Sequence, residues 1–223
     1  MKCVFSKDWE QGTNDLAARL RKELAAGKRV LWLVCGGSNI SASVKVMDMI
    51  TDEESEHLAI FLTDERYGEL DHASSNARQL REAGFHPKQA VFIPMLADAL
   101  SLGETTERYT QALRAAMEHA DIIIAQFGIG PDGHIAGILP NSPAVKSADW
   151  ITGYEAPPYI RITQTFEALR HIDVAYAMAF GADKHDALIR LRDETVPLEQ
   201  QPSQILKELP KAFVYSDQFK EKT

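Results

Sequence analysis

Helical and strand patterns alternate along this chain almost from start to end, and this alternation constrains the fold more than any other feature. The runs 29–34 (Arg-Val-Leu-Trp-Leu-Val) and 121–127 (Asp-Ile-Ile-Ile-Ala-Gln-Phe) are short and almost continuously apolar, which is typical of strands buried on both faces of a sheet. Segments of helical character separate such runs. One of them is 14–26, which is rich in Ala, Leu, Arg and Glu, and Gly27 directly after it is the expected C-cap. Alternation of this kind predicts a parallel sheet covered by helices.

The same pattern defines the remaining elements. The expected strands are 29–34, 58–63, 90–93, 121–127, 159–163, 173–180 and 212–215. The expected helices are 14–26, 38–50, 74–83, 104–119, 183–192 and 203–208. A sequence of 223 residues with this pattern, and with neither repeat nor linker, predicts one α/β domain over 1–223.

The charge balance restricts the partners. The chain has 24 Lys and Arg residues against 32 Asp and Glu, which gives a net charge of −8. A protein that binds nucleic acid or an anionic membrane surface diffusely is normally basic, so neither partner is expected. An anionic small ligand is compatible with this charge if a few Arg and Lys side chains gather at one place.

Nothing in the sequence predicts export or membrane insertion. Residues 1–8 contain no apolar stretch of the kind found in signal peptides. The longest apolar run, 174–182, is about half as long as a membrane-spanning helix needs to be. Cys3 and Cys35 have no metal-binding spacing, so we expect two free thiols in a reducing compartment and a cytoplasmic protein.

Two polar segments follow expected strands, at the end of the strands where open α/β sheets bind ligands. Gly36-Gly37-Ser38 precedes a helix. Its glycines let the backbone approach an anion, although the same residues fit a tight turn with Ser38 as an N-cap. Residues 63–66 (Thr-Asp-Glu-Arg) fit a solvated loop. They also fit an acid/base carboxylate, Asp64 or Glu65, beside an anion-binding Arg66.

The segment 128–134 (Gly-Ile-Gly-Pro-Asp-Gly-His) is the most informative. It follows the clearest expected strand, and its glycines and proline predict a loop of defined shape. His134 comes two residues after Asp132, an arrangement that suits a general base and its supporting carboxylate. Arg161, in an expected strand, and Lys184, at the start of an expected helix, are candidate cations for an anionic substrate.

From about residue 14 to residue 215, the order of these segments resembles the superfamily of 6-phosphogluconolactonases and glucosamine-6-phosphate deaminases. The resemblance is carried by Gly36-Gly37-Ser38, 63–66 with Ser75-Asn76, 128–136, 161–163 and Gly181-x-x-Lys184. It implies a three-layer α/β/α domain with a mainly parallel, Rossmann-like sheet.

Most positions that separate the two branches of this superfamily favour the lactonases. Deaminases typically carry a catalytic Glu five residues after the His, where this chain has Leu139, and Asp-Glu-Tyr where it has 64–66. Features similar to lactonases are Arg66, Ser75-Asn76, Pro131 and Leu139-Pro140. Departures from the lactonase pattern are Asn39-Ile40, Ile135 and Gly137.

The resemblance implies hydrolysis of 6-phospho-glucono-δ-lactone to 6-phosphogluconate, a step of the oxidative pentose phosphate pathway. His134 would be the general base that activates water, supported by Asp132 as the second catalytic residue. The substrate-binding and phosphate-binding residues it implies are Gly36, Gly37, Ser38, Asp64, Arg66, Asn76, Gly130, Arg161 and Lys184. The expected partner is a small-molecule sugar phosphate. No cofactor and no metal are expected, and the expected assembly is a monomer or small homo-oligomer.

Two alternatives follow from the same residues. One is an isomerase or deaminase acting on another sugar phosphate, in which Asp64 abstracts a carbon-bound proton and His134 assists ring opening. The missing Glu at position 139 counts against it. The other is a sugar-phosphate sensor without catalysis, against which the retention of Asp132 and His134 counts, because a binder has less need of a base.

Overall fold

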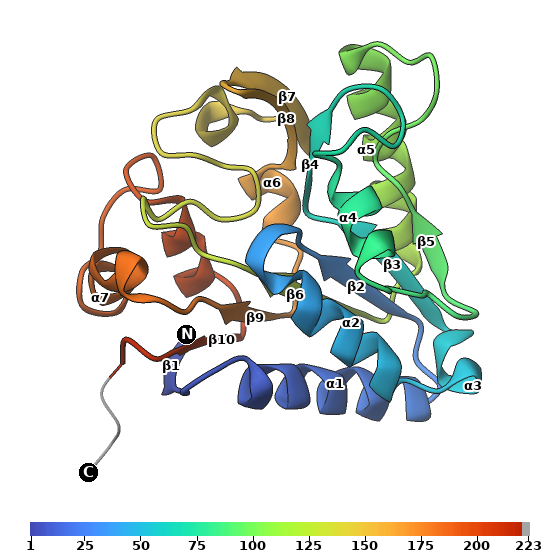
Figure 1. Ribbon diagram of the computed structural model, residues 1–223, viewed down its shortest axis with the longest axis horizontal. Coiled ribbons are helices and arrows are strands. Elements are labelled where there is room, and N and C mark those ends of the chain that lie inside the picture. Colours follow the sequence, from blue (N-terminus) through green and yellow to red (C-terminus); the bar gives the residue numbers. More distant parts are fainter. Residues whose placement is uncertain (220–223) are drawn as a thin grey trace.

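Seven parallel strands form the main sheet of this protein, in the order β1-β10-β9-β6-β2-β3-β5 (Figure 1). The computed structural model describes residues 1–219. The strands of this sheet are β1 (Lys2–Phe5), β2 (Val30–Val34), β3 (Leu58–Leu62), β5 (Val91–Ile93), β6 (Ile122–Phe127), β9 (Val174–Met178) and β10 (Ala212–Ser216). Every residue of β2, β6 and β9 is buried, as the continuous apolar runs predict.

Helices cover both faces of this sheet. They are α1 (Glu10–Ala25), α2 (Ile40–Met49), α3 (Asp52–Ser55), α4 (Asn76–Glu82), α5 (Leu102–His119), α6 (Phe166–Leu169) and α7 (His185–Asp193). Short 3₁₀ segments are η1 (Gly37–Asn39), η2 (Pro143–Lys146), η3 (Ala182–Lys184) and η4 (Pro202–Lys207). In Figure 1, α1 and α2 lie below the main sheet and α6 lies above it. The predicted α/β class with a mainly parallel sheet is confirmed.

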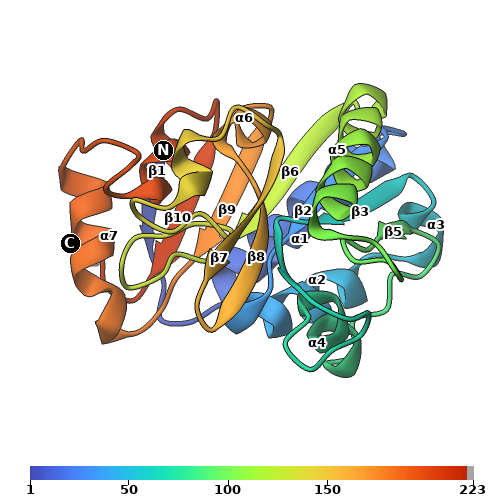
Figure 2. The ribbon, with the colours of Figure 1, turned by 90° about the horizontal axis from the view of Figure 1, so that it is seen from above.

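A second sheet of three antiparallel strands lies above the main sheet, in the order β4-β8-β7. Its strands are β4 (Asp64–Tyr67), β7 (Ile151–Ala156) and β8 (Tyr159–Gln164). Figure 2 shows the β7–β8 hairpin lying over the middle of the main sheet. The sequence pattern predicts β8 only as one more strand, and it does not predict β7 or β1. The interpretation of 63–66 as a solvated loop is wrong, since Asp64–Tyr67 is a paired strand.

Local sequence explains where the helices begin and end. Helix α5 begins at a capping box, in which Ser101 and Glu104 exchange side-chain and backbone hydrogen bonds. Four of its residues, Thr105, Tyr109, Leu113 and Met117, recur every four positions and are buried. The predicted helix 203–208 is instead the 3₁₀ segment η4, and the predicted start of 183–192 is the 3₁₀ turn η3.

The side chain of Tyr109 links α5 to the end of β3. Its hydroxyl accepts a hydrogen bond from the backbone N–H of Leu62 at 2.7 Å and donates one to the Leu62 carbonyl at 3.0 Å. Burial raises the pKa of Tyr109 well above its ordinary value, so the hydroxyl remains a donor. The contact fixes the end of β3, after which the chain continues into β4.

None of the helices formed by residues 1–219 is long and apolar enough to cross a membrane.

The pair formed by Arg29 and Asp121 holds the amino ends of β2 and β6 together. Asp121 accepts from the Arg29 backbone N–H at 2.9 Å and from its guanidinium at 3.1 and 2.9 Å. These hydrogen bonds lower the pKa of Asp121 from 3.8 to about 2. Because the pKa is lower in the folded protein, the stabilisation is complete above pH 3.8 and is lost as the pH falls toward about 2.

We therefore expect Asp121→Asn to be less stable than the unmodified protein at neutral pH, and the difference to disappear as the pH falls through this range. Urea unfolding midpoints measured at a series of pH values test this. Asp48→Asn is the control, because Asp48 is exposed on α2. A difference that persists unchanged at pH 2 would contradict the assignment.

Candidate active site

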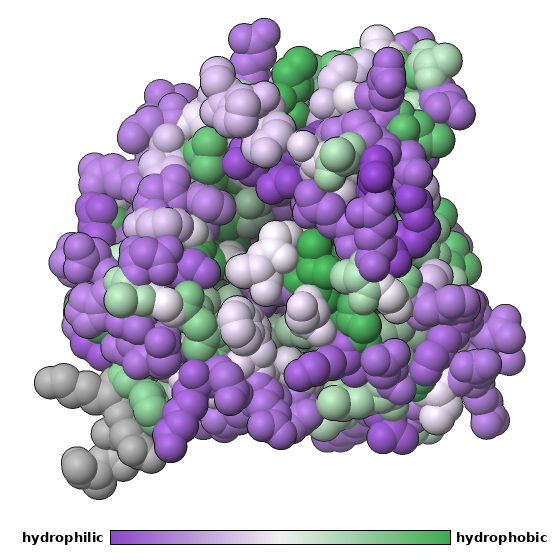
Figure 3. Space-filling model, viewed as in Figure 1, coloured by the Kyte–Doolittle hydropathy of each residue, from purple (hydrophilic) through white to green (hydrophobic). Residues whose placement is uncertain are grey.

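The candidate site lies at the point of the main sheet where the order of the strands changes side. From β2 the chain continues to β3 and β5 on one side, and from β6 it continues to β9 and β10 on the other. The neighbours β2 and β6 are therefore the topological switch point, where open α/β sheets bind ligands beyond the carboxyl ends of the strands. A pocket of about 270 Å³ is found there, and Figure 3 shows this face of the molecule hollowed near its centre.

Segments far apart in the sequence line this pocket. The lining residues are Cys35, Gly36, Gly37, Ser38, Asn39, Asp64, Arg66, Asn76, Gly128, Ile129, Gly130, Pro131, His134, Ala136, Arg161 and Lys184. The structure thus brings together all of the predicted site residues except Asp132, which contacts His134 from outside the pocket lining. Sequence reasoning assigned no role to Cys35 and noted Asn39 only as a departure from the lactonase pattern.

His134 and Asp132 form a close pair at the edge of the pocket. The Nδ1 atom of His134 lies 2.6 Å from Oδ1 of Asp132, which also accepts from the His134 backbone N–H at 3.1 Å. Burial raises the pKa of Asp132, but hydrogen bonding to His134 and the charge of His134 outweigh it and hold this pKa below its ordinary value. An ionised carboxylate only accepts hydrogen bonds, so Nδ1 carries the proton and Nε2 is available as a base.

The backbone of the loop holds this pair in place. Gly130 N–H donates to the His134 carbonyl at 3.1 Å, and Gly133 N–H donates to the Gly130 carbonyl at 2.9 Å. A Cβ atom at position 130 would lie 2.1 Å from the imidazole, so glycine is required there for close approach. Gly133 has φ +83°, in the left-handed region that favours glycine. The loop is therefore a fixed turn, as its glycines and proline predict.

The small sheet holds the same loop from the other side. The Tyr154 hydroxyl donates to the Gly137 carbonyl at 2.6 Å, and Gly137 N–H donates to Thr163 Oγ1 at 3.0 Å. A Cβ atom at position 137 would come within 2.8 Å of Thr163. The glycine at this position departs from the lactonase pattern, and it is the residue that this close contact with Thr163 requires. The hairpin therefore determines where the loop that carries His134 lies over the main sheet.

The strand geometry of β4 decides which of its carboxylates faces the pocket. Successive side chains of a strand point to opposite faces. Asp64 and Arg66 line the pocket, while Glu65 points away from it and is fully buried. The alternative that the sequence left open is thus settled as Asp64.

Three cations approach the pocket. Arg66 and Arg161 are direct partners in the antiparallel pairing of β4 with β8, and Lys184 comes from η3. The buried Nε atoms of both arginines find no hydrogen-bond partner among residues 1–219. Like charges directly opposite each other destabilise a sheet, so an anion between these side chains would offset that repulsion.

Two buried asparagines, Asn39 and Asn76, also line the pocket. Each donates through Nδ2 to a backbone carbonyl, Asn39 to Met178 at 3.1 Å and Asn76 to Asp64 at 3.0 Å. Because a carbonyl only accepts, these contacts fix the orientation of both amides. Their Oδ1 atoms have no donor within the described part of the chain. Ser38, in contrast, is exposed and makes no capping hydrogen bond to α2.

Cys35 is the buried thiol at the end of β2. Burial, together with the negative charge of Asp64, raises the pKa of Cys35 far above its ordinary value. The thiol is therefore protonated and a poor nucleophile. Residues 1–219 contain no group of three side chains placed to hold a metal ion.

Comparison with known proteins places this arrangement in context. The family model described as glucosamine-6-phosphate isomerases/6-phosphogluconolactonase matches residues 9–215. A 6-phosphogluconolactonase of Pseudomonas aeruginosa is 31% identical over 138 residues, which span 60% of this chain and 56% of that protein. The matched part is thus little more than half of that relative. A 6-phosphogluconolactonase of Thermotoga maritima is 25% identical over 186 residues, 81% of this chain and 82% of that protein.

A solved structure shares the fold. The crystal structure of a 6-phosphogluconolactonase from Shewanella baltica matches with a TM-score of 0.82 at 18% sequence identity. The match covers 97% of this chain and 97% of that chain. At this identity the likeness concerns the fold alone.

Glycine at position 36 is a steric requirement of the pocket that can be tested by unfolding. A Cβ atom there would lie 2.1 Å from Oδ1 of Asn76, a buried side chain that Asp64 holds in place. We expect Gly36→Ala to destabilise the fold by about 1–3 kcal/mol, as overpacking does. Urea denaturation measures this.

Gly103→Ala is the matched control. Gly103 is exposed in α5, and among residues 1–219 nothing lies within 4 Å of its ideal Cβ position. This variant should be more stable by about 0.4–1 kcal/mol, because alanine restricts the unfolded chain. Equal stabilities of the two variants would refute the steric argument.

Proposed function

Because the chain belongs to the glucosamine-6-phosphate isomerase/6-phosphogluconolactonase family, we propose that it hydrolyses 6-phospho-glucono-δ-lactone to 6-phosphogluconate. The observation that carries the proposal is the His134–Asp132 pair, 2.6 Å apart, at the edge of a pocket with three cations. Such a site combines a base for water with charge for a phosphate ester. The names of the relatives support the same activity.

In this proposal His134 acts first as base and then as acid. Nε2 takes a proton from a water molecule as its oxygen bonds to the lactone carbonyl carbon, which gives a tetrahedral oxyanion and an imidazolium. The bond from that carbon to the ring oxygen then breaks, and the imidazolium returns its proton to this oxygen. The products are a hydroxyl and a carboxylic acid, which releases the second proton of the water molecule to the solvent and becomes a carboxylate. Asp132 holds the imidazole in the required tautomer and stabilises its charged form.

The cations divide between the two ends of the substrate. The phosphate lies at the Gly36–Gly37 turn with Arg161 and Lys184, where backbone and side-chain donors meet. Arg66, opposite Arg161, serves the phosphate or the carboxylate that forms. The N–H groups of Gly130 and Gly133 are already hydrogen-bonded within their loop, so the oxyanion needs other donors, and we assign this role to the cations that line the pocket.

Position 139 argues against a deaminase. The resemblance places a catalytic Glu there in deaminases, but here Leu139 packs against the hydrophobic core. A leucine side chain cannot transfer a proton.

The direct test of the proposed activity is hydrolysis of freshly prepared 6-phosphogluconolactone, coupled to 6-phosphogluconate dehydrogenase and corrected for spontaneous hydrolysis. Ammonia release from glucosamine 6-phosphate, with no lactone hydrolysis above background, would replace this proposal by the deaminase.

Replacing His134 tests the proposed base. We expect His134→Ala to lower turnover by about 10²–10⁴-fold, the range that general base catalysis supplies. His119→Ala is the control, because His119 is exposed at the end of α5, outside the candidate site, and its side chain contacts the Ala115 carbonyl of its own helix at 2.8 Å. Unchanged turnover in folded His134→Ala protein would remove His134 from the mechanism.

Replacing Arg161 tests the phosphate site. Arg161→Ala should raise KM for the phosphorylated lactone, with a smaller effect on kcat, because it removes binding charge and leaves the base in place. Steady-state kinetics with glucono-δ-lactone, which lacks the phosphate, give the comparison. Equally efficient hydrolysis of both lactones by the unmodified protein would mean that no phosphate site exists.

A further inference from the structure

Glu65 is a fully buried carboxylate that lies outside the pocket. Its two oxygens accept four hydrogen bonds. The backbone N–H groups of Arg66 and Asn76 donate to Oε1 at 2.7 and 2.6 Å. The Ser75 hydroxyl and the Ala77 N–H donate to Oε2 at 2.9 and 3.0 Å. Three of these donors belong to the start of α4, so the carboxylate joins the small sheet to this helix.

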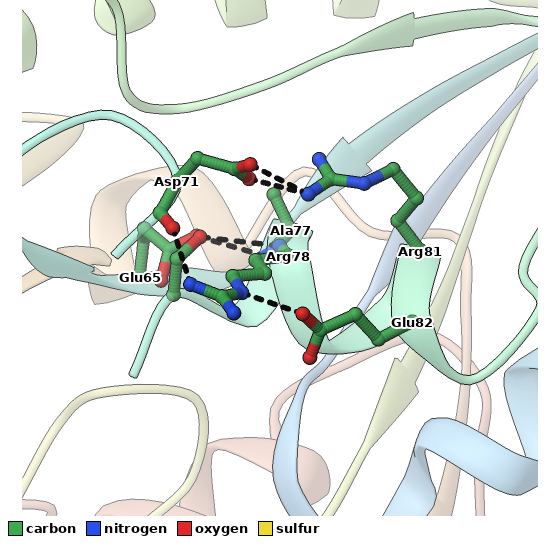
Figure 4. Close-up of polar contacts among 7 residues, drawn as sticks. Glu65, Asp71, Ala77, Arg78, Arg81 and Glu82 are labelled. Atoms are coloured by element: carbon green, nitrogen blue, oxygen red, sulfur yellow. Dashed lines mark hydrogen bonds and ion pairs between the residues drawn. The ribbon is translucent and has the colours of Figure 1, made fainter. Parts of the chain in front are cut away.

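The ion pairs made by Arg78 and Arg81 lie on the outer side of α4. Figure 4 shows Arg81 paired with Asp71, and Arg78 bonded to Glu82 and to the Asp71 carbonyl, while Glu65 reaches Ala77 from within. The outer ion pairs are exposed, and exposed pairs contribute little to stability. Burial raises the pKa of Glu65, and its four hydrogen bonds oppose that shift. Four donors from two elements fix the position of the Glu65 carboxylate, whereas the Glu82 carboxylate accepts from the Arg78 side chain alone among the hydrogen bonds of residues 1–219.

Two of the four residues that donate to Glu65, Arg66 and Asn76, line the pocket. Asp64 and Arg66 are its neighbours in β4 and point to the opposite face of the strand, into the pocket. Asn76 donates its N–H to Glu65 and its Nδ2 to the Asp64 carbonyl. The Arg66 guanidinium donates to the Ser74 carbonyl at 3.0 Å, just before the segment that Glu65 binds. A shift of Glu65 would therefore move Arg66 and Asn76, two residues that line the pocket.

We propose that Glu65 is a positioning residue for substrate binding, which sets the places of Arg66 and Asn76 in the pocket wall. This inference rests on the proposed function. It assigns Glu65 to binding rather than to proton transfer, because the loop that carries His134 is held by different contacts, those of Tyr154 and Thr163 with Gly137.

The substitution Glu65→Gln is the sharpest test. A glutamine has the same size but only one acceptor oxygen, and its amide N–H groups would face the peptide N–H donors of α4. We expect KM to rise by about 10- to 100-fold, the loss that misplaced binding groups cause. The value of kcat and its pH profile should stay as in the unmodified protein.

Two variants complete the design. Glu82→Gln makes the same chemical change on the outer side of α4, where Glu82 pairs with Arg78, and should leave KM unchanged. Glu65→Asp keeps the charge on a shorter side chain and should raise KM less than Glu65→Gln. If Glu65→Gln does not fold, Glu65→Asp alone decides, and an unchanged KM in it overturns the proposal.

The remaining outcomes separate this inference from the proposed function. A folded Glu65→Gln protein with unchanged KM, or with lowered kcat at unchanged KM, overturns the positioning role. If the unmodified protein hydrolyses no lactone, the proposed function fails by itself. The Kd of inorganic phosphate, measured by calorimetry, then judges the inference. Weaker phosphate binding in Glu65→Gln than in Glu82→Gln supports it, and equal binding overturns it.

Discussion

The parallel pairing of β2 with β6 is the interaction on which the rest of the structure depends. The two strands pair from Val30 with Ile122 to Leu33 with Ala125, and every side chain in them is buried. Chain connections leave this pair in opposite directions, so no crossover covers the carboxyl ends of the two strands. The pocket exists because of that opening, and the glycine turn after β2 and the histidine loop after β6 are its two sides.

A second layer of structure converts this opening into a chemically defined site. The main sheet supplies the loops, but the small antiparallel sheet supplies Asp64, Arg66 and Arg161 and ties down the histidine loop through Gly137. Donors and charges that are fixed in this way need little reorganisation when charge develops in a reaction. The main sheet therefore determines where the pocket lies, and the small sheet adds one carboxylate and two of the three cations that line it.

The sequence was most informative where local chemistry alone determines structure. The buried strands β2 and β6 could be predicted from continuous apolar runs, and the defined shape of the histidine loop could be predicted from its glycines. Both patterns lie within a few residues of the chain. The strand β7 was missed because its exposed and buried positions follow no regular alternation and a glycine interrupts it. The identity of Asp64 as the pocket carboxylate depends on the pairing of β4 with β8, about a hundred residues later, which no local pattern encodes.

The opposed arginines of β4 and β8 have a consequence for how such a protein evolves. Like charges directly opposite each other weaken a sheet, and under the proposed function a phosphate bound between these two side chains would remove that penalty. Selection for a more stable fold and selection for tight anion binding would therefore act in opposite directions on the same two positions. Selection for stability would favour substitutions that replace one arginine by an uncharged residue. Such substitutions would leave a well-folded protein that binds an anion more weakly.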